Sequence, residues 1–247
     1  MIIKEDHYFP FARHNRRLHI YVPDDYDDSN ERYPVMYFFD GHNLFLNEDA
    51  TYGTSWGLKE FLDQWSKKMI IVGIECSHEG EERLVEYCPY YFPRRYGRGF
   101  WGTGRQTMDW IVYDLKPYID SRFRTYPHRE ATGIGGSSMG GLMALCAISE
   151  YNFMFSKAAC LSSAIGSWVY SVRKSIRNHY TDSNTRIYMS YGSNEARKNT
   201  AKYHCILEDS FKEKGCAIWQ FCQENGEHCE RDWSKQVSQF MNYLWME

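Results

Sequence analysis

A glycine-flanked serine near the middle of the chain carries the clearest chemistry. Residues 136–140 read GSSMG, with Ser138 at the centre. A serine hydroxyl is a weak nucleophile at neutral pH, so it needs a base within hydrogen-bond reach and an exposed position beyond the sheet edge. The GxSxG turn supplies that position, because its small residues let a strand and the next helix approach closely around a strained serine. The pattern therefore predicts that Ser138 is the nucleophile of an enzyme that cleaves carboxylic esters.

Two other interpretations of this turn use the same residues. In the first, Ser137 and Ser138 only cap the helix that follows. In the second, the glycines form a phosphate-binding loop, but no lysine follows them, and Ser138 stands where a GxGxxG match would need a glycine. The flanking apolar segments favour the nucleophile over both.

The base that activates such a serine is expected near the C-terminus, because triads on this strand-turn-helix motif run in the order serine, acid, histidine. His228 follows an apolar segment that ends near Cys222 and precedes the last helical pattern. His204 falls in the middle of a predicted helix, and His179 ends a polar helix with no strand before it. His228 is therefore the predicted base.

The acid that orients the base is expected after the strand that precedes the base, at residues 186–191. The following turn contains one carboxylate, Glu195. An acidic residue in the first turn of a helix is also favourable without any catalytic role, so a solvated Glu195 is the alternative. The other candidate acids in this half of the chain are Asp182, Glu227 and Asp232.

Two backbone amides are expected to bind the oxyanion that forms when an ester carbonyl is attacked. One belongs to the residue after the nucleophile, Met139. The other is expected after an earlier strand, in the turn Asp40-Gly41-His42-Asn43, where we predict the His42 amide because the preceding glycine lets the chain approach the serine. The side chains of Asp40 and Asn43 can equally hold the turn in shape.

The elements that must position these residues alternate between buried strands and helices. Strand patterns occupy residues 17–23, 34–39, 69–74, 131–135, 158–161, 186–191 and 217–222, and helical patterns occupy residues 58–65, 108–119, 142–148, 171–178, 202–214 and 233–245. Such alternation is typical of an α/β protein with a mostly parallel central sheet and helices on both faces. A chain of 247 residues suits a single domain spanning 1–247.

Residues 76–105 lack this periodicity and are rich in aromatic side chains. We expect a long ordered loop that acts as a cap over the site, since long loops in compact domains are often functional. The residues predicted to contact substrate are Trp56, Tyr91, Phe100 and Trp101, and the further aromatic candidates are Tyr90, Phe92 and Tyr96. Packing is the alternative role for each of them.

Composition argues against several classes of protein. The 29 basic and 32 acidic residues nearly cancel, so no overall field would hold the chain on nucleic acid or on an anionic membrane. The first residues lack the pattern of a secretory signal, and no segment is long and apolar enough to span a bilayer, so a cytoplasmic protein is expected. An aromatic content of 17% leaves side chains for a pocket or for an interface, such as that of a homo-oligomer.

The cysteines and histidines do not predict a metal site. The eight cysteines are scattered through apolar segments without CxxC spacing, which favours reduced thiols. Cys222, His228 and Cys229 lie close in sequence, but no second pair of ligands matches them. We therefore predict no metal and no organic cofactor.

Several motifs in their order along the chain resemble the putative esterase family of α/β-hydrolases, which includes esterase D, enterochelin esterases, mycolyltransferases, and feruloyl and acetylxylan esterases. The motifs are YPVMY at 33–37, DGHNLF at 40–45, EYCP at 86–89, LKPYID at 115–120, GGSSMGG at 135–141, YGSNE at 191–195, and His228 followed by Trp233. The resemblance covers nearly the whole chain and departs from the family between Glu79 and Arg105.

The resemblance implies an α/β-hydrolase fold and a triad of Ser138, Glu195 and His228, with an oxyanion hole at the amides of His42 and Met139. It also implies small or carbohydrate-linked acyl esters as substrates. Two alternatives stay open, because some members transfer acyl groups to alcohols, and a chain of this fold can also be a catalytically silent module that binds carbohydrate or protein.

Overall fold

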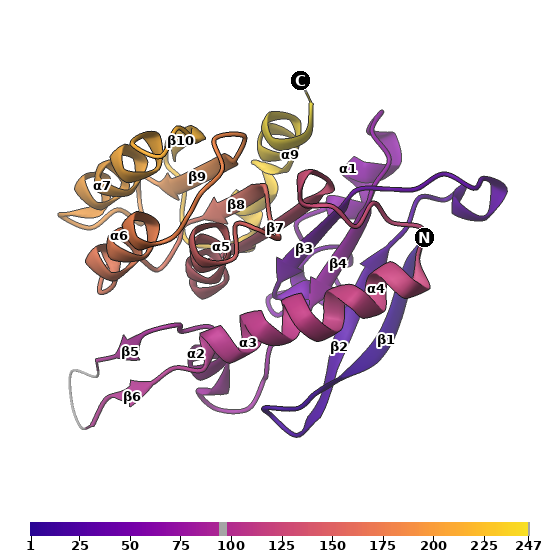
Figure 1. Cartoon of the computed structure of the whole chain (residues 1–247), viewed down its shortest axis with the longest axis horizontal. Coiled ribbons are helices and arrows are strands. Elements are labelled where there is room, and N and C mark those ends of the chain that lie inside the picture. The colour runs from indigo at the N-terminus through magenta and orange to yellow at the C-terminus, as the bar shows by residue number, and fades with distance from the viewer. Residues whose placement is uncertain (94–97, 247) are drawn as a thin grey trace.

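An eight-stranded, mostly parallel sheet organises the molecule (Figure 1). The computed structural model describes residues 1–93 and 98–246. The strand order is β1-β2-β4-β3-β7-β8-β9-β10, in which β1 pairs antiparallel with β2 and β2 with β4, and all other neighbours pair in parallel. The strands are β1 (Ile2–Phe9), β2 (His14–Tyr21), β3 (Val35–Phe39), β4 (Ile70–Ile74), β7 (Thr132–Ser137), β8 (Lys157–Leu161), β9 (Arg186–Gly192) and β10 (Ala217–Gln223).

The central strand β3 is apolar on both of its faces, as its sequence predicts. Val35, Tyr37 and Phe39 belong to one core cluster, and Met36 and Phe38 belong to the other. Because successive side chains of a strand point to opposite faces, a strand that is buried on both faces must be apolar throughout.

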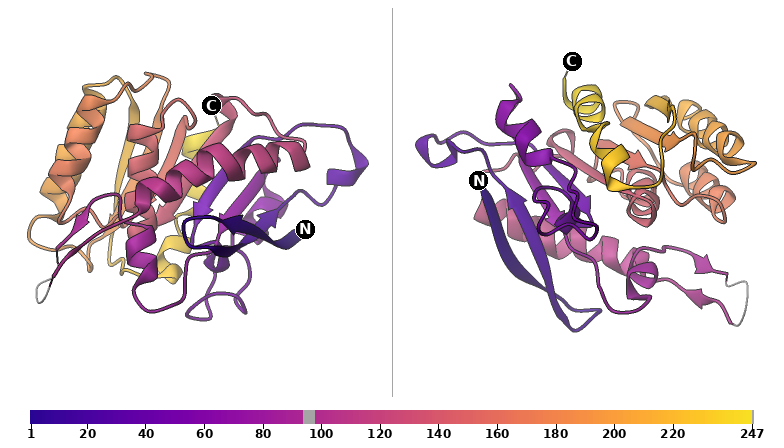
Figure 2. Two further views of the ribbon diagram at one scale, coloured as in Figure 1. Left: turned by 60° about the horizontal axis from the view of Figure 1, so that its bottom comes forward. Right: turned by 180° about the vertical axis from the view of Figure 1, so that it is seen from behind.

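Helices cover both faces of the sheet. On one face lie α3 (Gly104–Trp110), α4 (Lys116–Arg122), α5 (Met139–Glu150), α6 (Val169–Asn178) and α7 (Thr200–Lys212), with a π-helical turn at Ile111–Leu115 joining α3 to α4. On the other face lie α1 (Leu58–Gln64), α8 (Glu230–Ser234) and α9 (Val237–Trp245). The view from behind in Figure 2 shows α1 in purple and α9 in yellow on the same side. These layers confirm the predicted fold class.

The antiparallel hairpin β1–β2 is longer than the sequence predicts. The prediction contains a strand only at residues 17–23, and β1 is missing from it. Four of the eight residues of β1 are half-buried, three are exposed and only one is buried, so this edge strand lacks the apolar run by which the central strands are recognised.

The segment 76–105 is not the loop that its sequence predicts. Within its described residues it contains α2 (Glu82–Glu86) and a two-stranded hairpin of β5 (Tyr91–Phe92) and β6 (Phe100–Trp101). Elements of two to five residues are too short to show a helical or strand period in the sequence. Figure 1 shows the hairpin extending from the body of the molecule below α6. Tyr96 lies outside the described residues.

Among the described residues, no helix is long and apolar enough to cross a membrane. The parallel strands place their carboxyl ends at one edge of the sheet, and in open α/β sheets this is the edge at which ligands bind. The turns after β3, β7, β9 and β10 contain Asp40, Ser138, Glu195 and His228 in that order.

Candidate active site

Ser138 lies on a sharp turn between β7 and α5. Its backbone has φ of 56° and ψ of −119°, a conformation that residues other than glycine seldom adopt. The Ser138 amide donates to the Leu161 carbonyl at 3.0 Å, and its carbonyl accepts from the amides of Leu142 and Ala164 at 3.1 and 2.9 Å. Three backbone hydrogen bonds thus hold the serine in a strained conformation, as is typical of functional sites.

The turn depends on glycine where the strand and the helix meet. A Cβ atom added to Gly136 would lie 2.8 Å from the backbone carbon of Gly140. No side chain fits in that space, so β7 and α5 can approach this closely only with a glycine at position 136.

Glu195 lies in the turn after β9 and is almost fully hydrogen-bonded. Its Oε1 accepts from the Gly192 amide at 2.6 Å and from the Ser162 hydroxyl at 2.5 Å, and its Oε2 bonds to Nδ1 of His228. Burial alone would raise the pKa of Glu195, but the hydrogen bonds from His228, Ser162 and Gly192 outweigh it and lower that pKa. Glu195 is therefore held as a carboxylate against the imidazole.

His228 has one ring nitrogen engaged and one edge open to the site. Its Nδ1 bonds to Glu195, and its ring packs edge-on against Trp233 with centroids 5.0 Å apart. The side chain is 44% exposed and borders the same cavity as Ser138. Among the described residues no hydrogen bond joins the Ser138 hydroxyl to His228, and such contacts often tighten only when substrate is bound.

Ser162 and Trp233 form hydrogen bonds that hold Glu195 in place against His228. Ser162 was not among the residues predicted from the sequence. The indole Nε1 of Trp233 donates to the Ser162 hydroxyl oxygen at 2.8 Å, and that hydroxyl donates to Glu195. Ser162 has a positive φ of 43°. A serine at the end of β8 gave no sequence signal, because its role depends on the neighbouring strand.

The other candidate acids and bases have different partners. His179 bonds through Nδ1 to the carbonyl of Ser175 in α6. His204 borders the cavity, but it is 1% exposed, and burial lowers its pKa to about 4.

The alternative carboxylates are likewise engaged elsewhere. Asp232 accepts from the Glu227 amide and pairs with Arg231 and Lys235. The Asp182 carboxylate accepts a backbone amide within its own turn. The structure brings Glu195 to His228 and brings none of the three alternative acids there.

The two predicted oxyanion donors lie on turns that touch each other. Met139 is the first residue of α5, so its amide has no acceptor within the helix. The other turn begins at Asp40, which has φ of 58° and a carboxylate held by Arg83 through two bonds of 2.7 Å. A Cβ atom on Gly140 would lie 3.2 Å from Oδ2 of Asp40. His42 therefore lies in a turn that packs against the start of α5.

A close backbone approach also fixes the position of His42. A Cβ atom on Gly41 would lie 2.3 Å from the backbone carbon of Gly73 in β4. Only glycine lets the turn lie against that strand. The imidazole of His42 is buried and bonds through Nε2 to the Thr51 hydroxyl at 3.0 Å.

A cavity of about 830 Å³ opens beside Ser138 and His228. Its aromatic lining comes from Phe92, Trp168, Tyr191 and Tyr203, and its polar lining includes Ser163, Ser167, Arg197, Lys198 and Thr200. A cavity of this size suits a small-molecule ligand. Leu84 and Phe92 also line it, so part of the segment 76–105 borders the site.

The four aromatic residues predicted to contact substrate need correction, because none of them is among the described residues that line this cavity. Trp56 is 3% exposed and packs in the core against Phe38 and Trp233. Tyr91 and Trp101 are 42% and 75% exposed on the hairpin, and Phe100 stacks on Phe92 with centroids 4.9 Å apart. Phe92 lines the cavity and has Phe100 as its cross-strand partner, whereas Tyr91 pairs with Trp101 and neither of these two lines the cavity.

Three groups of potential metal ligands in the described part of the chain lie apart from Ser138. All eight cysteines have free thiols. His228 is engaged by Glu195 and is not grouped with Cys222 or Cys229. Among the described residues, the groups close enough to share an ion are His42 with Cys76 and His78, His14 with Glu82 and Glu86, and Glu227 with Cys229 and Asp232.

Comparison with known proteins agrees with this architecture. The chain is similar to the uncharacterized protein YbbA of Bacillus subtilis, with 27% identity over 243 residues that cover 94% of this chain and 93% of that protein. The BES protein of Bacillus cereus has a similar structure, with a TM-score of 0.78, 19% identity, and coverage of 98% and 94%. An IroE-like serine hydrolase from Shewanella oneidensis superposes with a TM-score of 0.76, 19% identity, and coverage of 98% and 79%. A family model described as "Putative esterase" matches residues 12–240. Because that match spans most of its length, the chain belongs to the putative esterase family and is a carboxylic ester hydrolase of α/β-hydrolase fold.

Proposed function

We propose that the chain hydrolyses carboxylic esters through an acyl-enzyme on Ser138, with His228 as general base and Glu195 as the acid that orients it. The observation that carries this proposal is the bond between the Glu195 carboxylate and Nδ1 of His228, both of which line the same cavity as Ser138. That bond fixes the Nδ1–H tautomer and leaves Nε2 as the acceptor for a serine proton.

The reaction then follows from the roles of these groups. The Ser138 oxygen attacks the ester carbonyl carbon as Nε2 of His228 takes its proton, and the oxyanion accepts hydrogen bonds from the amides of Met139 and His42. The tetrahedral intermediate collapses, the bond to the leaving alcohol breaks, and His228 gives that alcohol its proton. Water attacks the acyl-enzyme in the same manner, which releases the carboxylic acid and restores Ser138.

Small or carbohydrate-linked acyl esters are the proposed substrates. The cavity combines aromatic rings, among them Trp168 and Tyr203, with hydroxyl groups, among them Ser163 and Thr200. Aromatic rings offer a large apolar surface, and hydroxyl groups supply the few directed hydrogen bonds that orient a ligand. A sugar ester presents an apolar ring face and hydroxyls, so it matches both kinds of lining.

Labelling with a fluorophosphonate probe tests the nucleophile directly. We expect one phosphonyl adduct, located by mass spectrometry on Ser138, and none in Ser138→Ala. Turnover of p-nitrophenyl acetate by that variant should fall by about four orders of magnitude or more, because triad members act as a unit. Ser167→Ala is the matched control, since Ser167 also lines the cavity but lies outside the strained turn. Labelling that persists in Ser138→Ala would overturn the assignment.

A panel of acetyl, butyryl, feruloyl and acetylated-sugar esters tests the substrate class. The proposal expects the highest kcat/KM on acetyl or sugar-linked esters. If longer acyl chains on simple alcohols are cleaved fastest, the substrate proposal fails while the serine mechanism stands.

A further inference from the structure

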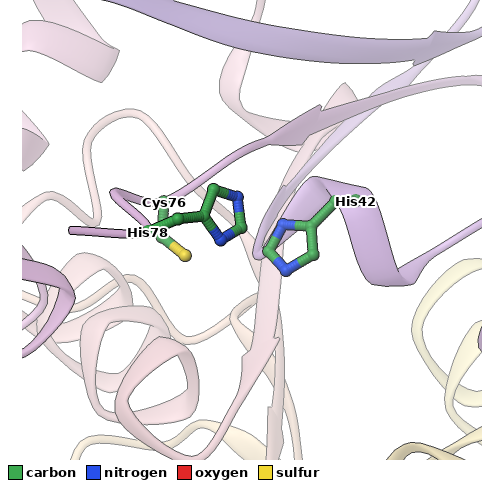
Figure 3. Close-up of side chains that lie close together, drawn as sticks. All are labelled: His42, Cys76 and His78. Carbon is green, nitrogen blue, oxygen red and sulfur yellow. The ribbon is translucent and has the colours of Figure 1, made fainter. Parts of the chain in front are cut away.

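A second cluster of reactive side chains lies beside the turn after β3, apart from the cavity at Ser138. His42 comes from that turn, and Cys76 and His78 come from the chain just after β4. Their potential ligand atoms all lie within 4.8 Å of one another. Figure 3 shows the two imidazole rings close together, with the Cys76 sulfur near the ring of His78. None of the three is among the described residues that line the cavity.

His42 offers a buried nitrogen that has no partner. Its Nε2 bonds to the Thr51 hydroxyl at 3.0 Å, while its Nδ1 is buried without a hydrogen bond in the described part of the chain. The residue is 5% exposed, and burial lowers the pKa of its imidazole. A neutral ring whose Nε2–H donates to Thr51 carries a free lone pair on Nδ1, which is the form that binds a metal ion.

His78 is held in the same tautomer by a carboxylate. Its Nε2 bonds to Oε1 of Glu75 at 2.7 Å, and Oε2 of Glu75 bonds to Nε2 of His19 at 3.0 Å. Burial would raise the pKa of Glu75, but the hydrogen bonds from His19 and His78 outweigh it and lower that pKa to about 2. A carboxylate that accepts the second N–H of a histidine is the usual outer partner of a metal-binding imidazole.

Cys76 contributes a soft ligand, and its surroundings favour a cation. It is 3% exposed, and its thiol lies close to the buried carboxylate of Asp40. Burial raises the pKa of the thiol, so a metal ion must displace the proton to water when it binds sulfur. The carboxylates of Asp40 and Glu75 flank the cluster, and Arg83 is already paired with Asp40.

We propose that Nδ1 of His42, Sγ of Cys76 and Nδ1 of His78 form a binding site for one thiophilic divalent cation of the Zn²⁺ class. Two imidazoles and a thiolate are a ligand set that Zn²⁺ prefers, and a water molecule completes four-coordination. With bonds of about 2.1 Å to nitrogen and 2.3 Å to sulfur, tetrahedral ligand atoms lie about 3.5 Å apart. Because the potential ligand atoms lie within 4.8 Å of one another, the cluster must contract by no more than about 1.3 Å. Such a movement is open to His78, because its side chain is 55% exposed.

Cobalt titration tests the site without reference to ester hydrolysis, so its failure would leave the proposed function untouched. The reduced, chelator-treated protein is titrated with Co²⁺, and Zn²⁺ affinity is then measured by competition. We expect a thiolate-to-cobalt charge-transfer band that saturates at one equivalent and disappears when Zn²⁺ is added. No band with the wild-type chain would overturn the proposal.

Single substitutions locate the bound ion. Cys76→Ser should abolish the band, and His78→Ala, at an exposed position that tolerates change, should weaken Co²⁺ binding by at least tenfold. Glu75→Gln should weaken it by about 10-fold to 100-fold, as loss of an outer carboxylate partner does. Cys229→Ser is the matched control, because Cys229 lies in another group of potential ligands, with Glu227 and Asp232. If Cys229→Ser removes the band and His78→Ala does not, the site is wrongly placed.

Discussion

Two regions border the cavity and are built in different ways. One is the hydrogen-bonded network of Glu195, Ser162 and Trp233 that holds His228, and the other is the hairpin of β5 and β6. In the network, Glu195 accepts hydrogen bonds from Gly192, Ser162 and His228, and the indole N–H of Trp233 donates to the Ser162 hydroxyl. In the hairpin, two of the four paired residues, Tyr91 and Trp101, are strongly exposed. Under the proposed mechanism the network fixes the atoms that move protons, whereas the hairpin presents a surface that a ligand can contact.

This difference explains why one region tolerates little change and the other tolerates more. When one partner of a buried hydrogen bond is removed, the remaining donor or acceptor is unsatisfied, and the fold loses about 1–3 kcal/mol of stability. Removal of an exposed ring such as that of Trp101 leaves neither a cavity nor an unsatisfied polar group, because the ring is already largely in contact with water. Substitutions in the network should therefore lower kcat by orders of magnitude more than substitutions in the hairpin do.

Glu195→Gln should give the largest difference between the regions. An amide in place of the carboxylate can no longer stabilise the imidazolium of His228 or fix its tautomer, so kcat should fall by about 10³-fold to 10⁴-fold. Steady-state hydrolysis of p-nitrophenyl acetate measures it. Glu227→Gln is the control, since Glu227 pairs with Arg231 on the surface. A tenfold loss or less in Glu195→Gln would mean that another carboxylate orients His228.

Ser162→Ala should produce an intermediate effect. The change removes one donor to Glu195 and leaves the indole N–H of Trp233 without its acceptor. Because the serine acts through Glu195, we expect a loss of about 10-fold to 100-fold in kcat, as for other residues that orient a catalytic group.

A double-mutant cycle distinguishes positioning from general destabilisation. If Ser162 acts only by orienting Glu195, adding Ser162→Ala to Glu195→Gln should cost little further activity. If kcat of the double variant falls by the product of the two single losses, Ser162 contributes to activity independently of Glu195.

The sequence predicts the network much better than it predicts the hairpin, and the reason is physical. Ser138 and the candidates Glu195 and His228 each stand in a short turn at the end of an apolar strand, where local residues determine the backbone. The position of Phe92 depends on how a hairpin packs against α6, where Trp168 donates to the Tyr91 carbonyl at 2.8 Å. Such a contact between residues 77 positions apart leaves no local pattern. Ser162 was missed for the same reason.

The contribution of the Glu195 carboxylate to the stability of the fold should depend on pH. The folded state lowers the pKa of Glu195, so its carboxylate stabilises the fold above the ordinary glutamate pKa of about 4.3, and this contribution is lost as the pH falls through the lowered value. The difference in free energy of unfolding between wild type and Glu195→Gln should shrink as the pH falls below about 4. Denaturant titrations from neutral to acid pH measure it. A difference that grows on acidification would contradict the sign.

The smallest expected effect lies within the hairpin itself, between two neighbouring aromatic rings. Phe92 lines the cavity and packs against Trp168 with centroids 5.2 Å apart, whereas Trp101 is 75% exposed and faces away. An aromatic contact contributes about 1 kcal/mol, so Phe92→Ala should raise KM about fivefold with little change in kcat. Trp101→Ala should leave both constants within about twofold, since surface changes of this kind are usually within ±0.5 kcal/mol. If Trp101→Ala raises KM as much as Phe92→Ala does, the exposed face of the hairpin also contacts substrate, and the hairpin then closes over the cavity during turnover.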